Sequence, residues 1–122
     1  MPNPVVHFEI MGGPGEQGKA LQQFYRDAFQ WDVTVQAEYG DYGLVGPQDG
    51  KGIGGGIGPS DQGPYSAIFI EVADPAEALK TVQQHGGKVL VDVTEMPGVV
   101  TFAMFQDPAG NTVGLVKADQ QG

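Results

Sequence analysis

The chain has 122 residues, and its 40% hydrophobic and 17% charged content is that of one globular domain rather than a disordered chain. Six Lys and Arg residues against fifteen Asp and Glu give a formal charge of -9, and the scattered basic residues argue against nucleic acid and anionic membranes as partners. The chain has no cysteine, which excludes disulfides and thiolate metal sites.

The sequence shows no signal for membrane insertion or export. No stretch approaches the roughly 18 to 20 unbroken apolar residues that a membrane-spanning helix needs. The N-terminal residues Met1-Pro2-Asn3-Pro4 have neither the basic nor the apolar region of a signal peptide. We therefore expect a cytoplasmic protein of bacterial type.

The first half of the chain predicts one helix among four strands. In the first strand His7 and Glu9 alternate with apolar residues, so these two side chains share one face of the strand. The helix is predicted where apolar residues recur at helical spacing. The predicted strands are 5–10, 31–35, 42–45 and 53–57, and the predicted helix is 16–29.

After a linker at residues 59–64, the same order of elements begins again. Asp74 is expected to cap the second helix, with Pro75 at its first position and Glu77 placed to reach back to the cap. The helix is predicted to end at Gly86-Gly87, since glycine tolerates the left-handed cap. The predicted strands of this half are 67–72, 88–93, 99–105 and 112–116.

The two halves also resemble each other in sequence, which indicates an internal duplication. Residues 48–54, QDGKGIG, are similar to residues 106–114, QDPAGNTVG, with a turn that is two residues shorter. We therefore predict an α+β fold in a single domain, 1–122, made of two βαβββ modules, 4–58 and 65–117. Two such modules facing each other would form a curved, partly closed sheet around a cavity.

Several short segments, in this order, resemble the vicinal oxygen chelate (glyoxalase/bleomycin resistance protein/dioxygenase) superfamily. They are Val6-His7-Phe8-Glu9-Ile10, Phe29-Gln30-Trp31, Glu71-Val72-Ala73-Asp74, Gly86-Gly87-Lys88-Val89 and Asp107-Pro108-Ala109-Gly110-Asn111. The resemblance covers nearly the whole chain and implies the two-module fold. It does not settle the reaction, since this superfamily contains both enzymes and metal-free binding proteins.

The resemblance implies where metal ligands would stand if this chain were like the superfamily's metal-dependent members. Those members place a His on the first strand of each module and a Glu on the last strand. His7 stands at the first of these positions, but the second falls on Ala67 or, in a shifted register, on Phe69. The two Glu positions correspond to Gly54 and Gly114. One ligand of the usual set remains, so we expect no cofactor.

A divalent metal is the alternative, because His7, Glu9 and Glu71 share the expected cavity-facing parity and are suitable ligand types. His7 and Glu9 could equally be an acid–base pair for proton transfer. They could also simply hydrogen-bond each other or their neighbours without a catalytic role. Tyr39, Tyr42 and Tyr65 border loops and could line the mouth of a pocket.

We expect the glycines on the last strands to leave room for a ligand or for close backbone contact. An apolar wall would be formed by Met96, Met104, Phe69 and Phe105. The residues predicted to line the cavity are His7, Glu9, Gly54, Phe69, Glu71, Met104 and Gly114.

Two functions remain open at this point. One is metal-independent binding of a small, partly apolar organic molecule in the concave cavity. The other is a glyoxalase-like lyase, isomerase or dioxygenase that uses His7 with Glu9 or Glu71 for proton transfer or metal binding. The resemblance also implies a homodimer, in which modules pair within a chain or between chains.

Overall fold

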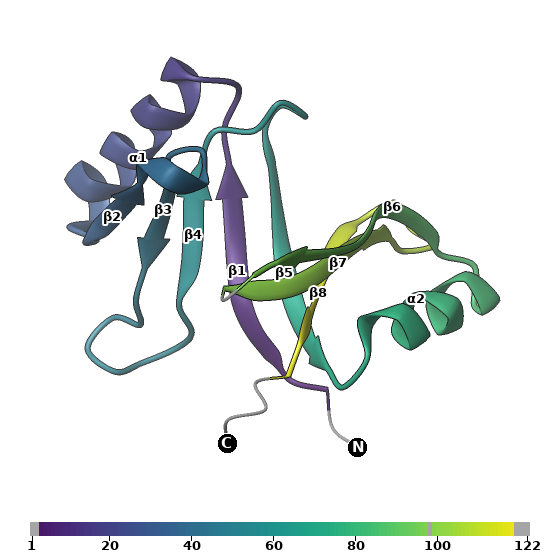
Figure 1. The fold of residues 1–122 in the computed structure, drawn as a ribbon. Helices are drawn as coiled ribbons and strands as arrows, with labels where there is room; N and C mark the ends of the chain where they lie inside the picture. The colour runs from purple at the N-terminus through teal and green to yellow at the C-terminus, as the bar shows by residue number, and fades with distance from the viewer. Residues whose placement is uncertain (1–2, 98, 119–122) are drawn as a thin grey trace. The chain divides into compact units, whose positions relative to one another are not determined.

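The computed structural model describes residues 3–97 and 99–118 and shows an α+β protein with two compact units (Figure 1). The His7 unit is His7–Ser66, and the Phe69 unit combines the chain up to Val6 with the chain from Ala67 onward. Each has one α-helix and a mixed sheet, and the order strand, helix, three strands occurs twice along the chain. This confirms the predicted fold of two βαβββ modules.

The elements agree with the predicted ranges except at their ends. The first half contains β1 (Val5–Met11), α1 (Glu16–Phe29), β2 (Val33–Gln36), a short 3-10 helix (Ala37–Tyr39), β3 (Tyr42–Val45) and β4 (Gly55–Gly58). The second half contains β5 (Tyr65–Val72), α2 (Pro75–Gln84), β6 (Lys88–Met96), β7 (Val100–Gln106) and β8 (Thr112–Lys117). The predicted strand at 31–35 starts two residues later, because Trp31 is used for stacking against Tyr25, with ring centroids 5.2 Å apart.

In the His7 unit, α1 covers one face of a sheet with strand order β2-β3-β4-β1. The strands β1 and β4 are parallel, and the other pairs are antiparallel. Val33, Val45 and Ile57 are buried, and Phe8 of β1 and Leu21 of α1 pack against them. Because side chains alternate along a strand, His7 and Glu9 lie on the opposite face of β1.

In the Phe69 unit, α2 covers one face of a sheet with strand order β5-β8-β7-β6. The core beneath α2 contains Leu79 and Leu115, and Ile70 and Val72 of β5 pack against it. Alternation then places Phe69 and Glu71 on the face away from α2. Both residues that the sequence offered as counterparts of His7, Ala67 and Phe69, therefore lie on this face.

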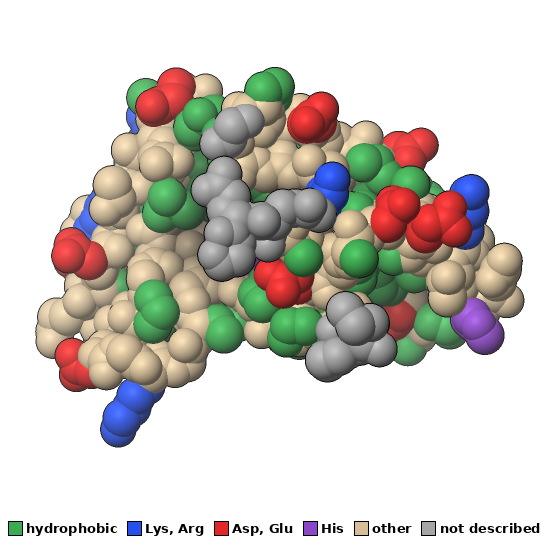
Figure 2. Space-filling model, turned by 60° about the horizontal axis from the view of Figure 1, so that its bottom comes forward, with side chains coloured by type: hydrophobic (Ala, Val, Ile, Leu, Met, Phe, Trp, Pro, Cys, Tyr) green, Lys and Arg blue, Asp and Glu red, His purple; other side chains and the backbone are tan. Residues whose placement is uncertain are grey.

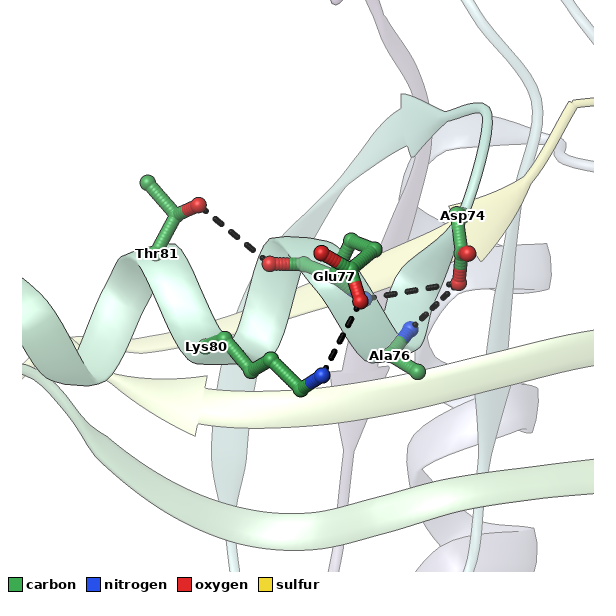
Figure 3. Close-up of polar contacts among 5 residues, drawn as sticks. All are labelled: Asp74, Ala76, Glu77, Lys80 and Thr81. Carbon is green, nitrogen blue, oxygen red and sulfur yellow. Dashed lines mark hydrogen bonds and ion pairs between the residues drawn. The ribbon is translucent and has the colours of Figure 1, made fainter.

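The start of α2 is capped as predicted (Figure 3). Oδ1 of Asp74 accepts hydrogen bonds from the backbone N–H groups of Ala76 and Glu77, at 3.0 and 3.4 Å. The Glu77 side chain differs from the expectation: its carboxylate accepts a hydrogen bond from Lys80 Nζ at 3.0 Å. The i,i+3 spacing brings this cation within reach on the exposed helix surface.

On the face drawn in Figure 2, acidic side chains are spread over the surface, and the few Lys and Arg side chains stand apart from one another. Within the described part of the chain, no helix is long and apolar enough to cross a membrane.

Candidate functional site

The polar face of the His7 unit carries four hydrogen-bonded side chains, which we call the Glu9 cluster: His7, Glu9, Tyr42 and Tyr65. The Tyr42 hydroxyl donates to Glu9 Oε2 at 3.0 Å, and the Tyr65 hydroxyl donates to Glu9 Oε1 at 2.9 Å. His7 Nε2 lies 2.9 Å from the Tyr42 hydroxyl oxygen. The four groups form one continuous chain of hydrogen bonds in which each carboxylate oxygen has its own phenol donor.

Three strands bring these side chains together. His7 and Glu9 are two residues apart on β1, so they share a face of the sheet. Tyr42 is the first residue of β3, and Tyr65 is the first residue of β5. Between β1 and β3 lies β4, where Gly56 pairs with Glu9 in register and a Cβ atom would overlap the Tyr42 phenol. The glycine therefore lets Tyr42 cross β4 and reach both β1 side chains.

Burial sets the protonation of the cluster. Burial raises the pKa of Glu9, and the hydrogen bonds from Tyr65 and Tyr42 partly oppose that rise. Burial and the negative charge of Glu9 raise the pKa of both Tyr42 and Tyr65, which keeps the phenols protonated as donors. Burial also lowers the pKa of His7, which favours the neutral imidazole at neutral pH.

The positions of the protons follow from donor counting. A phenol has one proton, so Tyr42 can accept from His7 when its own proton is donated to Glu9. This arrangement requires the His7 proton on Nε2. When the cluster holds one more proton, that proton can lie on His7, with Tyr42 donating to Glu9, or on Glu9, with Tyr42 donating to His7. The geometry thus permits this added proton to pass between His7 and Glu9 through Tyr42.

Glu9 has no cationic partner among the described residues. The two ion pairs found there, Lys19 with Glu16 and Lys80 with Glu77, lie on exposed helix surfaces. A partly buried carboxylate with neutral donors alone pays a desolvation cost when it ionises. A cationic group that approached Glu9 would compensate that cost.

The residues at the superfamily's metal positions do not fit a metal ion. Gly54 corresponds to Gly114 in the sequence repeat. Because Phe8 pairs with Gly55 and Phe69 pairs with Gly114, this match makes Phe69 the counterpart of His7. Phe69 and the two glycines have no ligating side chain. His7, the one ligand type left, already contacts the Tyr42 hydroxyl through Nε2. Within residues 3–97 and 99–118, no group of three or more His, Asp or Glu side chains is arranged to hold a metal.

The predicted cavity residues of the second half lie on one face of the Phe69 unit. Phe69, Gly114 and Met104 are direct register neighbours across β5, β8 and β7. The space at Gly114 is filled, because a Cβ atom there would overlap the Phe69 ring. At Gly54 a Cβ atom would meet the Val45 carbonyl oxygen at 2.8 Å. Gly54 thus makes the close backbone contact that was one of the two expected alternatives, whereas the space at Gly114 accommodates the Phe69 ring.

Glu71, which the match of Gly54 with Gly114 makes the counterpart of Glu9, lies on the face of β5 away from α2. Its backbone N–H donates to the Pro4 carbonyl at 2.8 Å. Sequence reasoning identified His7 and Glu9 but gave Tyr42 and Tyr65 no defined role. A signal for Tyr42 was present, namely a tyrosine at the start of a predicted strand that is followed by a glycine-rich strand.

Comparisons with known proteins agree with this fold. No curated protein matches the chain at a significant level. A hypothetical protein from Bacillus halodurans C-125 has 13% identity and a TM-score of 0.65, over 100% of this chain and 99% of that one. A variant of Streptomyces coelicolor methylmalonyl-CoA epimerase, in complex with 2-nitronate-propionyl-CoA, has 16% identity and a TM-score of 0.62, over 98% and 97% of the two chains.

A third structure, a glyoxalase/bleomycin resistance protein/dioxygenase superfamily member from Vibrio splendidus 12B01, has 14% identity and a TM-score of 0.62, over 96% and 100% of the chains. At these identities the likeness concerns the fold alone. The family model of the Glyoxalase/Bleomycin resistance protein/Dioxygenase superfamily matches residues 15–115. The chain belongs to the glyoxalase/bleomycin resistance protein/dioxygenase superfamily.

Proposed function

We propose that this protein binds a small, partly apolar organic molecule without a metal, and that Glu9 is the polar anchor for the ligand. The observation that carries the proposal is the Glu9 carboxylate, partly buried, held by two phenol hydroxyls and lacking an ion pair among the described residues. Pockets for small molecules are usually apolar with a few fixed polar groups of this kind.

The geometry of the carboxylate indicates the ligand group that it favours. An ionised carboxylate can accept about four hydrogen bonds, and Tyr42 and Tyr65 supply one to each oxygen. Further acceptor positions remain for N–H or O–H donors from a ligand. A cationic donor is favoured because it also offsets the desolvation cost of the charge.

Three aromatic probes of equal size test this proposal: benzylamine, benzyl alcohol and benzoate. We expect calorimetry to show the tightest binding for benzylamine, weaker binding for the alcohol and the weakest for benzoate. Glu9→Gln should remove the preference for the amine. Glu71→Gln, at the equivalent position of the other unit, is the matched control for loss of one negative charge. A preference for benzoate, or no difference between the three probes, would refute the proposal.

A second candidate function is proton transfer on a bound substrate, as in a lyase or isomerase. It is favoured by the unbroken chain from His7 through Tyr42 to Glu9, since these groups can exchange one proton. The test is incorporation of deuterium from solvent into a carbon acid such as methylmalonyl-CoA, or into the hemithioacetal of methylglyoxal and glutathione. Loss of exchange in Glu9→Gln would support the enzyme, and no exchange with either substrate would favour binding.

Metal independence is tested directly by metal analysis of protein purified without added metal or chelator. We expect less than stoichiometric zinc, nickel, manganese and iron, because Phe69, Gly54 and Gly114 stand at three of the usual ligand positions. A stoichiometric metal that is lost in His7→Ala would overturn this part of the proposal and revive the dioxygenase and glyoxalase reactions.

We also propose that the protein is a homodimer. In the Phe69 unit β6 is the last strand of the sheet, and Leu90 and Val93 on it are 48% and 38% exposed. An exposed strand edge with apolar side chains favours association. Light scattering after size-exclusion chromatography should give about twice the chain mass of 12.8 kDa. A particle of one chain mass at micromolar concentration would contradict the dimer.

A further inference from the structure

We propose that Gly56 is a positioning residue of the Glu9 cluster: its missing side chain provides the space in which the Tyr42 hydroxyl joins His7 to Glu9. The inference deepens the proposed function, because it names the feature of β4 that gives Glu9 its first phenol donor. It rests on that function only for the effect on ligand binding.

The space at Gly56 is occupied by the hydroxyl end of the Tyr42 side chain. A Cβ atom built at Gly56 would overlap the Oη, Cζ and Cε2 atoms of Tyr42. The same oxygen lies 2.9 Å from His7 Nε2 and 3.0 Å from Glu9 Oε2. Any side chain at residue 56 therefore competes for the place where the two hydrogen bonds meet.

The backbone at Gly56 does not itself demand glycine. Gly56 is not among the glycines with positive φ, such as Gly50 and Gly52 in the preceding turn. An alanine thus fits the extended strand, and the three nearest atoms to its methyl group all belong to the end of a tyrosine side chain. A side chain of this kind can rotate away. The expected result of Gly56→Ala is a displaced phenol rather than a broken strand.

The neighbouring glycines serve other purposes. A Cβ atom at Gly55 would overlap the Phe8 ring on the helix-covered face and meet the Phe8 carbonyl oxygen at 2.5 Å. At Gly58 the nearest atoms lie at ordinary contact distances of 3.4 to 3.6 Å. Gly56 is the strand glycine whose space receives the hydroxyl of the cluster, which explains why this position, in register with Glu9, has no side chain.

The chemical consequence of displacing Tyr42 is that the two carboxylate oxygens of Glu9 no longer have one phenol donor each. With Tyr42 in place, Oε2 and Oε1 each accept one phenol hydroxyl, and His7 is tied to the same chain. If Tyr42 is displaced, Tyr65 remains on Oε1 while Oε2 loses its donor. The bridge between Glu9 and His7 is then gone, although neither residue has been changed.

The test is the ring nitrogen spectrum of histidine in the wild type and in Gly56→Ala. The chain has two histidines, and His85, the C-cap residue of α2 in the other unit, is an internal control. We expect the Nε2 signal of His7 to shift in Gly56→Ala in the same direction as in Tyr42→Phe, with His85 unchanged. Gly46→Ala, where a Cβ atom meets nothing within 4 Å, is the matched control and should leave both histidines unchanged.

A His7 signal that shifts in Tyr42→Phe but not in Gly56→Ala would overturn the inference, because Tyr42 would keep its place beside a methyl group. If Gly56→Ala does not fold alone, the double variant Gly56→Ala with Tyr42→Ala decides. A double variant that folds shows that the clash was with the phenol. A double variant that stays unfolded shows that residue 56 meets other atoms, and the inference fails.

Benzylamine binding gives the functional part of the test. Gly56→Ala and Tyr42→Phe should each weaken binding by about tenfold, the size expected for a disturbed hydrogen bond to a charged group. The double variant Gly56→Ala with Tyr42→Phe should be no weaker than the single ones, since both changes remove one contact. Additive losses would contradict a shared mechanism. If the wild type does not bind benzylamine, the proposed function fails, while the histidine spectra still decide the role of Gly56.

Discussion

The two modules differ at equivalent positions on the face that their helices leave uncovered. When Gly54 is matched with Gly114, as in the sequence repeat, the pairing registers match His7 with Phe69 and Glu9 with Glu71. In the His7 unit a tyrosine reaches over a glycine strand and joins a histidine to a glutamate. In the Phe69 unit a phenylalanine ring fills the space above its glycine.

This difference teaches that one backbone arrangement can serve two chemical purposes. In both modules a strand glycine makes room for an aromatic ring from a neighbouring strand. Where the ring carries a hydroxyl, as in Tyr42, the gap becomes a polar site. Where it does not, as in Phe69, the gap becomes part of an apolar surface. The predictions below test each side of this comparison.

The largest effect is expected for Gly114→Glu. Any Cβ atom at this position overlaps the Phe69 ring, and overpacking of this kind typically costs about 1 to 3 kcal/mol. Chemical denaturation should show the variant destabilised by about 2 to 3 kcal/mol. The same change made in a Phe69→Ala background should cost much less. An equal loss in both backgrounds would show that the ring is not what fills the gap.

The next largest effect is expected for Tyr42→Phe, which removes a hydroxyl that contacts both His7 and Glu9. Hydrogen bonds to charged groups contribute about 1.5 to 3 kcal/mol, and partial exposure favours the lower end, so we expect a loss of about 1.5 kcal/mol. Tyr65→Phe removes one contact and should cost less, about 1 kcal/mol. Thermal unfolding measures both losses of stability. A larger loss in Tyr65→Phe than in Tyr42→Phe would contradict the central place of Tyr42 in the hydrogen-bonded cluster.

The helices offer a smaller contrast. Asp74 caps α2 through its side chain, whereas α1 begins after Gly15 without a side-chain cap. Asp74→Ala should destabilise the protein by about 1 kcal/mol, and Asp74→Asn should restore most of the loss because asparagine is an equally good N-cap. Urea denaturation measures both variants. A loss in Asp74→Asn as large as in Asp74→Ala would mean that the negative charge near the helix start, and not the hydrogen bond, is what matters.

The smallest effect is a pH dependence that belongs to Glu9. Because burial raises the pKa of Glu9, the folded protein holds this proton more tightly than the unfolded chain. The free energy of unfolding therefore contains a contribution that is full below the unfolded pKa, near 4.5, and is lost as the pH rises through the folded pKa. Glu9→Gln has no carboxyl group to ionise at this position, so it does not lose this contribution. The free energy of unfolding of Glu9→Gln minus that of the wild type should therefore rise as the pH increases from about 4 to about 8.

His7 acts with the opposite sign, which is why the comparison uses the difference between Glu9→Gln and the wild type. Its pKa is lowered by burial, so its contribution is present above the unfolded value of 6.5 and is lost as the pH falls through the folded pKa. Thermal melts across this range measure the difference, with Glu71→Gln as the control for net charge. A difference between Glu9→Gln and the wild type that stays flat would contradict the raised pKa of Glu9.

Much of the fold could be predicted because it depends on local patterns. Alternation along β1 and helical spacing along α1 give each element its type and its inward face. The Asp74-Pro75 start of α2 is a local signal, as is the linker at 59–64. Strand ends were less well predicted, since β4 begins at Gly55 where pairing with Phe8 starts, two residues after the predicted position.

The candidate site could be predicted only in part. His7 and Glu9 were found because they share a face of one strand, which a period of two reveals. Their joining through Tyr42 depends on a residue 33 positions from Glu9 and on the empty side chain of Gly56. The register of β5, and with it the match of Phe69 to His7, also needed the pairing with β8.

The sequence by itself determined the two-module architecture and the absence of cysteine from the chain. These properties depend on composition and local periodicity. Only the tertiary structure decided which atoms fill the gaps left by glycine and which side chains hydrogen-bond to one another. Contacts of that kind depend on strand register and on side-chain direction across separate strands, and a sequence pattern does not encode either one locally.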